Sequence, residues 1–201
     1  MGEKMYQLSL TYFDIAAGRA EPARLAMHIG SIPFEDIRFP FSQFAEVKKK
    51  TPLNQVPVLT IDGRQITQCN SINRFIGKLA GLYPEDNFQA MLCDEIMSAL
   101  EDAVNKLMPT FHLPEKEMKN AREALAAGPF TLYLQRNGGT YFADNRLTMA
   151  DLKVFEWVRT LNSGFLDHIP ATLVENTAPL LNEHMQRIAQ IPAVAEYYAK
   201  G

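Results

Sequence analysis

A proline directly before a predicted hairpin, within residues 51–71, restricts the fold of this chain more than any other feature. Residues 58–61 favour a strand, and Asp62-Gly63 is a strong two-residue hairpin signal before a returning strand. Proline has no N–H for a sheet ladder, so Pro57 must open a strand or lie at a sheet edge. The segment therefore predicts a hairpin whose first strand is an edge strand opening with Val56 and Pro57.

The backbone of Val56 gives this hairpin a possible binding role. On an edge strand its N–H and C=O stay unpaired, and an extended peptide can add to them as a further strand. A helix follows, capped by Asn70 or Ser71, with apolar residues at helical spacing over residues 72–79. Its first amides favour a carboxylate. The stretch indicates either a cradle for a small, extended, acidic peptide or an ordinary edge hairpin.

Composition is that of an ordinary soluble globular protein of one or two domains. A formal net charge of −3, without a stripe of Lys and Arg, argues against a nucleic-acid binder. The longest uncharged stretch, residues 124–135, is too short to span a bilayer. Cys69, Cys93 and four scattered histidines show no metal-ligand spacing. We therefore expect a cytoplasmic, reduced protein with no metal, membrane or nucleic-acid partner.

Hydrophobic periodicity predicts an α/β unit in the first part of the chain. Residues 7–13 alternate as a first strand, and residues 34–39 fit a second. Between them, residues 18–30 have helical spacing with Pro22 in the first turn. With the hairpin and its helix, this gives a small mixed sheet covered by helices.

The rest of the chain indicates helices alone. Residues 82–88 break the pattern and are predicted to be a linker between an α/β domain at residues 1–81 and an all-helical domain at residues 89–201. Thr148 to Asp151 fits a capping box at the start of one helix. The expected helices are residues 90–107, 117–135, 149–162 and 179–190.

Tyr12 is the first candidate for chemistry, because it ends the first strand beside an irregular run. A hydroxyl at the C-terminal end of a strand is well placed to face a ligand. Close to a thiol, it would donate a hydrogen bond to the thiolate and lower the thiol pKa. A core tyrosine with a satisfied hydroxyl is the alternative. Arg19, at the start of the first helix, is either a second functional residue or a solvated arginine.

Three further residues are candidates for ligand binding. Lys48 begins a run of three lysines, which is either a solvated turn or a cation for a ligand carboxylate near Val56. Gln68 can bond the amine or carboxylate of a ligand. Cys69 is either an apolar filler or a thiol at a helix N-terminus.

Six motifs of this chain have an informative order and spacing. They are Tyr12-Phe13, Gly18-Arg-Ala-Glu21, Gln55-Val-Pro-Val-Leu59, Asp62-Gly63, Gln68-x-x-Ser71-Ile and Leu147-Thr-x-Ala-Asp151. Over essentially the whole chain they resemble the cytosolic glutathione transferases. The sigma class, with the haematopoietic prostaglandin D synthases and the lens S-crystallins, is the most similar. The resemblance implies a thioredoxin-like α/β N-terminal domain, an all-α C-terminal domain, and a homodimer that uses glutathione.

The resemblance also implies a role for individual residues. Tyr12 would stabilise the glutathione thiolate as the catalytic residue, and Arg19 would assist. Val56 would pair through its backbone with the cysteinyl part of glutathione, with Pro57 following a cis peptide bond. The other implied glutathione contacts are Phe13, Phe44, Lys48, Gln55, Gln68, Cys69 and an acid of the partner subunit, Asp102 in preference to Glu101. The implied hydrophobic substrate pocket draws on Phe13, Ile15, Met108 and Phe111.

The chain departs from the family pattern at three places. Cys69 stands where the family usually has serine, and a thiol is a weaker donor to the γ-glutamyl carboxylate. Phe44 replaces a tryptophan near the glycyl end. Met108 to Phe111 replaces the pocket tryptophan of the prostaglandin synthases, which argues against that activity.

The predicted function is conjugation of glutathione to hydrophobic electrophiles. Isomerase and peroxidase activities use the same thiolate and stay open. The alternative is a catalytically weak, crystallin-like or ligand-binding protein, which Cys69 favours and Tyr12 disfavours.

Overall fold

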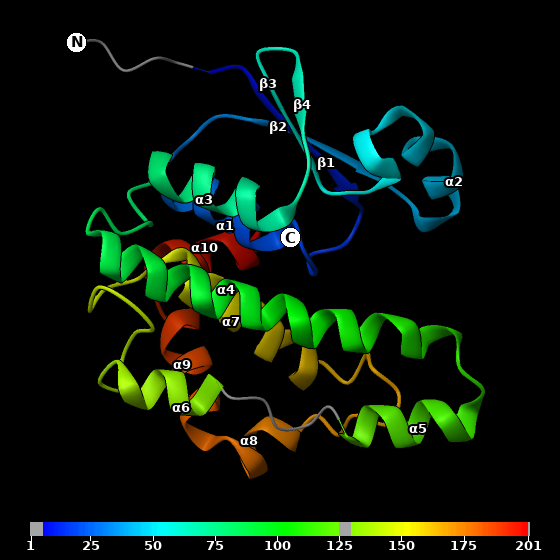
Figure 1. The fold of residues 1–201 in the computed structure, drawn as a ribbon, viewed down its shortest axis with the longest axis vertical. Helices are drawn as coiled ribbons and strands as arrows, with labels where there is room; N and C mark the ends of the chain where they lie inside the picture. The colour runs from blue at the N-terminus through cyan, green and yellow to red at the C-terminus, as the bar shows by residue number, and fades with distance from the viewer. Residues whose placement is uncertain (1–5, 125–129, 201) are drawn as a thin grey trace.

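A four-stranded sheet forms the centre of the N-terminal domain in the computed structural model, which describes residues 6–124 and 130–200 (Figure 1). The strand order is β2-β1-β3-β4. The strands are β1 (Leu8–Phe13), β2 (Glu35–Phe39), β3 (Val58–Ile61) and β4 (Arg64–Ile66). Only β1 and β2 are parallel, while β3 is antiparallel to both of its neighbours. The predicted small mixed sheet is confirmed.

One face of β1 forms the core of this domain. Leu8, Leu10 and Tyr12 are buried, and the residues between them are only partly buried. Helices α1 (Glu21–Ile29) and α3 (Cys69–Leu79) lie along the side of the sheet that faces the helical domain (Figure 1). The alternation predicted for the first strand is confirmed.

The hairpin is present, but β3 is not an edge strand. Asp62 and Gly63 both have positive φ, 49° and 83°, as a tight two-residue turn requires. Because β3 pairs with β1 as well as with β4, the sheet edges are β2 and β4, and the edge prediction was wrong. Pro57 avoids the ladder by preceding the first residue of β3. The backbone of Val56 therefore makes no hydrogen bond with any described residue.

Short helical turns connect β2 to β3 beside the sheet (Figure 1). They are η1 (Phe41–Gln43), α2 (Phe44–Val47), η2 (Lys48–Lys50) and η3 (Pro52–Asn54). The peptide bond between Val56 and Pro57 is cis, as the resemblance implied.

The cap expected for α3 at Asn70 or Ser71 was wrong. The helix begins at Cys69, and Gln68 occupies the N-cap position with φ 74° and no capping bond from its side chain. The Asn70 amide instead turns toward the second domain, where it donates to the carbonyl of Met97 at 3.3 Å. The start of α3 is thus held by a tertiary contact.

The second domain consists of helices, and the described chain after β4 contains no strand. Its elements are α4 (Asn87–Leu107), η4 (Met108–His112), α5 (Glu115–Ala124), α6 (Phe130–Arg136), α7 (Met149–Asn162), α8 (Leu173–Thr177), α9 (Pro179–Ala189) and α10 (Pro192–Ala199). The bounds of α7 match the prediction. The helix expected over residues 117–135 is represented by α5 and α6, and residues 125–129 lie outside the described residues.

Helix α7 lies at the centre of this domain and also contacts α1 of the first. Its predicted capping box is confirmed, because the Asp151 carboxylate accepts from the backbone N–H of Thr148 at 2.8 Å. The same buried carboxylate accepts from the N–H of Phe142 at 3.1 Å and lies 2.9 Å from His184 Nε2. This carboxylate ties the start of α7 to two other segments.

Residues 6–124 and 130–200 contain neither a membrane-spanning helix nor a metal-binding cluster. No helix there combines the length and apolar character needed to cross a membrane. No group of three or more His, Cys, Asp or Glu side chains is arranged to hold a metal ion.

Gly77 tests the packing of α3 against α7. A Cβ at this position would lie 2.4 Å from Met149 Cγ and 3.3 Å from Tyr83 Cβ. Both neighbours are buried, so we expect Gly77→Ala to lower the free energy of unfolding by about 1–3 kcal/mol through overpacking. Urea denaturation measures this, with Ser71→Ala at an exposed position of α3 as the control. Equal stability of the two variants would contradict the close approach.

Candidate functional site

The hydroxyl of Tyr12 is buried at the end of β1 and contacts the loop before α1. Its oxygen accepts a hydrogen bond from the backbone N–H of Arg19 at 3.2 Å. Gly18, with φ +79°, lies so close that a Cβ there would be 2.8 Å from the hydroxyl oxygen. Burial raises the pKa of Tyr12, and this outweighs the opposing bond from Arg19. The hydroxyl therefore keeps its proton at neutral pH and can donate it to a ligand.

Arg19 contacts the helical domain through its guanidinium group. Its Nε donates to Glu101 Oε2 at 2.9 Å, and its Nη2 donates to Asn105 Oδ1 at 2.8 Å. The other oxygen of Glu101 accepts from Lys153 Nζ at 2.8 Å. Burial alone would raise the pKa of Glu101, but Lys153 and Arg19 lower it to about 2. Glu101 is therefore an anion held between two cations, one from each domain.

Cys69 lies at the start of α3 beside this ionic cluster. Its side chain is buried, and burial raises the pKa of the thiol to about 11 even though the charge of Lys153 opposes the shift. Lys153 also donates to Asn70 Oδ1 at 2.6 Å, which fixes the first turn of α3. Cys69 is thus a neutral thiol at neutral pH.

The open backbone of Val56 lies between two exposed glutamines. Gln68 Nε2 donates to Gln55 Oε1 at 3.4 Å, so the residues before Pro57 and before α3 meet at the surface. These side chains offer both donors and acceptors to a polar ligand.

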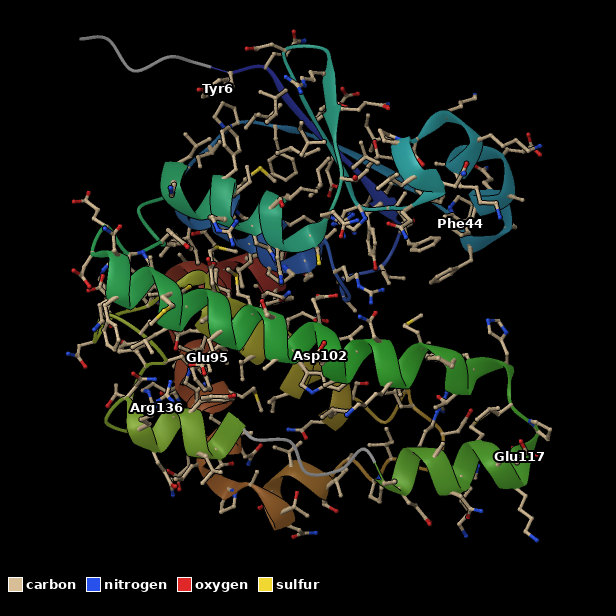
Figure 2. All side chains as sticks on the ribbon, in the orientation of Figure 1. Tyr6, Phe44, Glu95, Asp102, Glu117 and Arg136 are labelled. Carbon is tan, nitrogen blue, oxygen red and sulfur yellow. The ribbon has the colours of Figure 1, made fainter. Side chains whose placement is uncertain are left out.

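The ring of Phe13 contacts both Tyr12 and the helical turns that follow β2. Its ring lies 5.1 Å from the ring of Tyr12 and 5.2 Å from that of Phe44, centre to centre. Lys48 places its ammonium 5.6 Å from the centre of the Phe44 ring. Figure 2 shows Phe44 on α2, beside the sheet. The predicted residues Tyr12, Phe13, Phe44 and Lys48 therefore form one continuous surface.

Three other predicted residues, Met108, Phe111 and Asp102, lie in the helical domain, and Ile15 lies next to Phe13, to whose carbonyl its N–H donates at 2.9 Å. Met108 and Phe111 follow α4 in η4 and are 46% and 41% exposed. Neither is hydrogen-bonded to or stacked on Tyr12 in the described part of the chain, and the ring of Phe111 lies 4.6 Å from the Arg122 guanidinium. Ile15 is partly buried in the loop after β1. Asp102 lies midway along α4, where it is exposed and makes no ion pair with any described residue (Figure 2).

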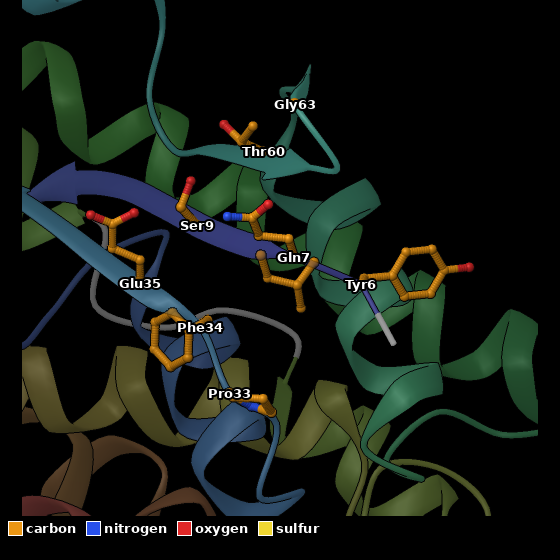
Figure 3. Close-up of a pocket in the computed structure, with 9 residues that line it drawn as sticks. Tyr6, Gln7, Ser9, Pro33, Phe34, Glu35, Thr60 and Gly63 are labelled. Atoms are coloured by element: carbon orange, nitrogen blue, oxygen red, sulfur yellow. The ribbon is translucent and has the colours of Figure 1, made fainter. Parts of the chain in front are cut away.

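A depression of about 540 Å³ lies elsewhere, beside the starts of β1 and β2 and the tip of the hairpin (Figure 3). Its lining residues are Tyr6, Gln7, Leu8, Ser9, Pro33, Phe34, Glu35, Thr60 and Gly63. None of the predicted site residues contributes to it, so it is separate from the surface around Tyr12.

Two charged residues of α7, which were not predicted from the sequence, also reach this site. Lys153 binds Glu101, and Glu156 Oε1 accepts from the backbone N–H of Gly18 at 2.7 Å. Burial raises the pKa of Glu156 to about 7. A signal was present, because Lys153 and Glu156, three positions apart on one face, interrupt the apolar residues of α7.

Comparison with known proteins gives consistent matches over both halves of the chain. Residues 8–78 match the model of the glutathione S-transferase N-terminal domain, and residues 101–201 match that of the C-terminal domain. Glutathione S-transferase 3 of Caenorhabditis elegans is 32% identical, with 98% of this chain and 97% of the relative covered.

Two solved structures are also similar. Prostaglandin synthase D of Nilaparvata lugens has a TM-score of 0.84 at 25% identity, covering 96% of this chain and 98% of its own. The sigma-class glutathione transferase of Fasciola hepatica has a TM-score of 0.80 at 25% identity, covering 98% and 97%.

Glu101 provides a stability test of the ionic cluster. Glu101→Gln leaves the ammonium of Lys153, which is 2% exposed, without its anion, so we expect a loss of roughly 3–5 kcal/mol at pH 7. The folded-state pKa of Glu101 lies below its ordinary value of 4.5. Its stabilisation is therefore fully present above pH 4.5 and is lost as the pH falls toward 2. Urea denaturation from pH 3 to pH 8 measures the difference between wild type and variant.

The control is Glu95→Gln on the same helix. Glu95 pairs with Arg136 at 2.5 Å, but both side chains are exposed, so less than about 1 kcal/mol should be lost (Figure 2). A loss at Glu101 as small as that at Glu95, or one independent of pH, would contradict the role of Glu101 as the anion that pairs with the buried Lys153.

Proposed function

We propose that this chain, which belongs to the glutathione S-transferase family, forms the glutathione thiolate with the Tyr12 hydroxyl and conjugates it to hydrophobic electrophiles. Membership of the family makes the chain a transferase that acts on glutathione. The assignment of roles to individual residues is the proposal.

The hydrogen bonding of Tyr12 is the observation that carries it. The hydroxyl oxygen accepts from the N–H of Arg19, and no described residue accepts the hydroxyl proton. The bond from Arg19 polarises the hydroxyl and strengthens it as a donor. Because burial keeps its pKa high, Tyr12 meets a thiolate as a neutral donor rather than as a second anion.

The proposed reaction needs no further base. The glutathione thiol gives its proton to water, and Tyr12 stabilises the thiolate that remains. A lone pair of the thiolate sulfur then forms a bond to an electrophilic carbon. With an aryl halide, the halide leaves with the electrons of its bond to carbon. A thiolate is a far better nucleophile than a thiol, so lowering the thiol pKa accounts for acceleration at neutral pH.

The proposed glutathione site follows the surface around Tyr12. The backbone of Val56 makes no hydrogen bond with any described residue, which suits antiparallel pairing with the cysteinyl part. The other proposed contacts are Phe13, Phe44, Lys48, Gln55, Gln68 and Cys69. Lys48 would face the glycyl carboxylate, and Gln68 with the start of α3 would face the γ-glutamyl end.

A homodimer is part of the proposal. Glu101 is bound to Arg19 and Lys153 of its own chain, whereas Asp102 is exposed and unpaired among the described residues. This supports Asp102 of the partner subunit as the acid that meets the γ-glutamyl amine. Ile15, Met108 and Phe111 would supply apolar surface to the electrophile. Isomerase and peroxidase reactions would start from the same thiolate.

Tyr12→Phe tests the proposal, because it removes the donor and keeps the ring. We expect the thiol pKa of bound glutathione to rise toward that of a free thiol, about 8.5. We also expect kcat/KM with an aryl halide to fall about 10- to 100-fold, since a hydrogen bond to a charged group is lost. Ultraviolet difference titration of bound glutathione and steady-state kinetics measure the two effects.

Tyr141→Phe, at a partly buried tyrosine of the helical domain, is the control and should behave as wild type. If both variants bind glutathione with the wild-type thiol pKa and rate, Tyr12 has a structural role only. A wild-type protein that binds glutathione without lowering its thiol pKa would instead be the ligand-binding or crystallin-like protein.

A further inference from the structure

The loop over residues 14–18 reaches Tyr12 and is held from three sides. Arg24 on α1 donates to the carbonyl of Ile15 at 2.9 Å. Arg159 on α7 donates to the carbonyl of Ala16, and Glu156 on α7 accepts from the N–H of Gly18. Asp14 and Ile15 also contact β2, through Phe39 and Arg38. The contacts with Ala16 and Gly18 come from the helical domain, from residues more than 130 positions away in the sequence.

Of these contacts, the one made by Glu156 is next along the backbone to the N–H that binds the Tyr12 hydroxyl. Gly18 N–H bonds to Glu156 Oε1 at 2.7 Å, and the next N–H along the chain, that of Arg19, bonds to the Tyr12 oxygen at 3.2 Å. Two successive backbone donors are thus bound on one side by α7 and on the other by the hydroxyl.

Gly18, whose Cα lies between these two N–H groups, depends most on outside contacts to keep one backbone conformation. Gly18 has φ +79°, and glycine populates positive and negative φ with similar ease. The Gly18–Arg19 peptide is held on its carbonyl side by the N–H of Glu21, which donates to the Gly18 carbonyl at 3.2 Å. Without a partner for the Gly18 N–H, the preceding peptide loses its restraint, and the N–H of Arg19 can shift away from the hydroxyl. The hydrogen bond from Gly18 to Glu156 restricts the backbone at Gly18, which is the position where glycine leaves it least restricted.

Glu156 is itself held in place. Thr160 Oγ1, one turn further along α7, donates to the same Oε1 at 2.8 Å. The side chain is buried, and Arg159 and Glu21 are the charged groups that act on it. Burying a carboxyl group in a core costs stability unless hydrogen bonds compensate, and here the bond to Gly18 is one of the compensating bonds.

From this geometry we infer that Glu156 is a positioning residue for the reaction, which holds the N–H of Gly18, and with it the backbone next to the Gly18–Arg19 peptide, so that the Arg19 N–H stays on the Tyr12 hydroxyl. The inference rests on the proposed role of Tyr12 as the donor to the thiolate. It assigns to α7, in the helical domain, a part in activating glutathione in addition to packing.

The test compares Glu156→Ala, which removes the acceptor, with Glu156→Gln, whose amide oxygen can still accept from Gly18. For Glu156→Ala we expect a higher thiol pKa of bound glutathione and about a tenfold lower kcat. The KM for glutathione should stay within about twofold, because the binding residues are not changed. Glu156→Gln should recover most of the loss. Glu183→Gln, an exposed acid on α9, controls for the change in charge.

Thr160→Val keeps the test decisive if Glu156→Ala does not fold. It removes the donor that orients Glu156, so about a threefold fall in kcat is expected in a protein that stays folded at the assay temperature, with a lower melting temperature. A folded Glu156→Ala, or otherwise Thr160→Val, with the wild-type thiol pKa and kcat would overturn the inference. So would a rise in KM alone, which indicates a binding role.

A double variant separates this inference from the function on which it rests. If Glu156 acts through Tyr12, adding Glu156→Ala to Tyr12→Phe should lower kcat no further than Tyr12→Phe alone. Full additivity would overturn the positioning role while leaving Tyr12 as the donor. If Tyr12→Phe itself leaves the thiol pKa unchanged, the proposed function fails first, and the inference fails with it.

Discussion

The ion pair between Arg19 and Glu101 is the contact on which the arrangement of the site depends, because it joins the loop before α1 to α4 of the helical domain. Lys153 completes the pair from α7 and also holds Asn70 at the start of α3. A buried cation, Lys153, and a partly buried one, Arg19, around one anion are stable only with close geometry and further hydrogen bonds, and both are present here. The relative placement of the two domains is therefore specific.

This arrangement gives the helical domain control over a site formed mainly by the other domain. The loop beside Tyr12 is held by Glu156 and Arg159, and the start of α3 is held by Lys153. Hydrogen bonds from α7 therefore fix both segments that flank the proposed glutathione site. The N-terminal domain supplies the hydroxyl that we propose as the donor to the thiolate and the open backbone of Val56, and the helices determine how precisely these groups are presented.

Local sequence signals predicted the parts of the fold that local physics determines. Strand alternation in β1, the Asp62-Gly63 turn and the capping box at Asp151 each involve residues within a few positions of one another. The placement of β3 could not be predicted in this way, because pairing with β1 on one side and β4 on the other depends on the whole sheet. The roles of Lys153 and Glu156 depend on contacts between residues 52 to 138 positions apart.

The measurement that tests the account most directly is a crystal structure of the protein with bound glutathione. We predict that the sulfur lies within hydrogen-bond distance of the Tyr12 hydroxyl oxygen, while the backbone of Val56 pairs with the cysteinyl residue and Arg19 N–H stays on the hydroxyl. Glutathione bound with its sulfur directed away from Tyr12, or bound in the depression beside Ser9 and Glu35, would contradict the account.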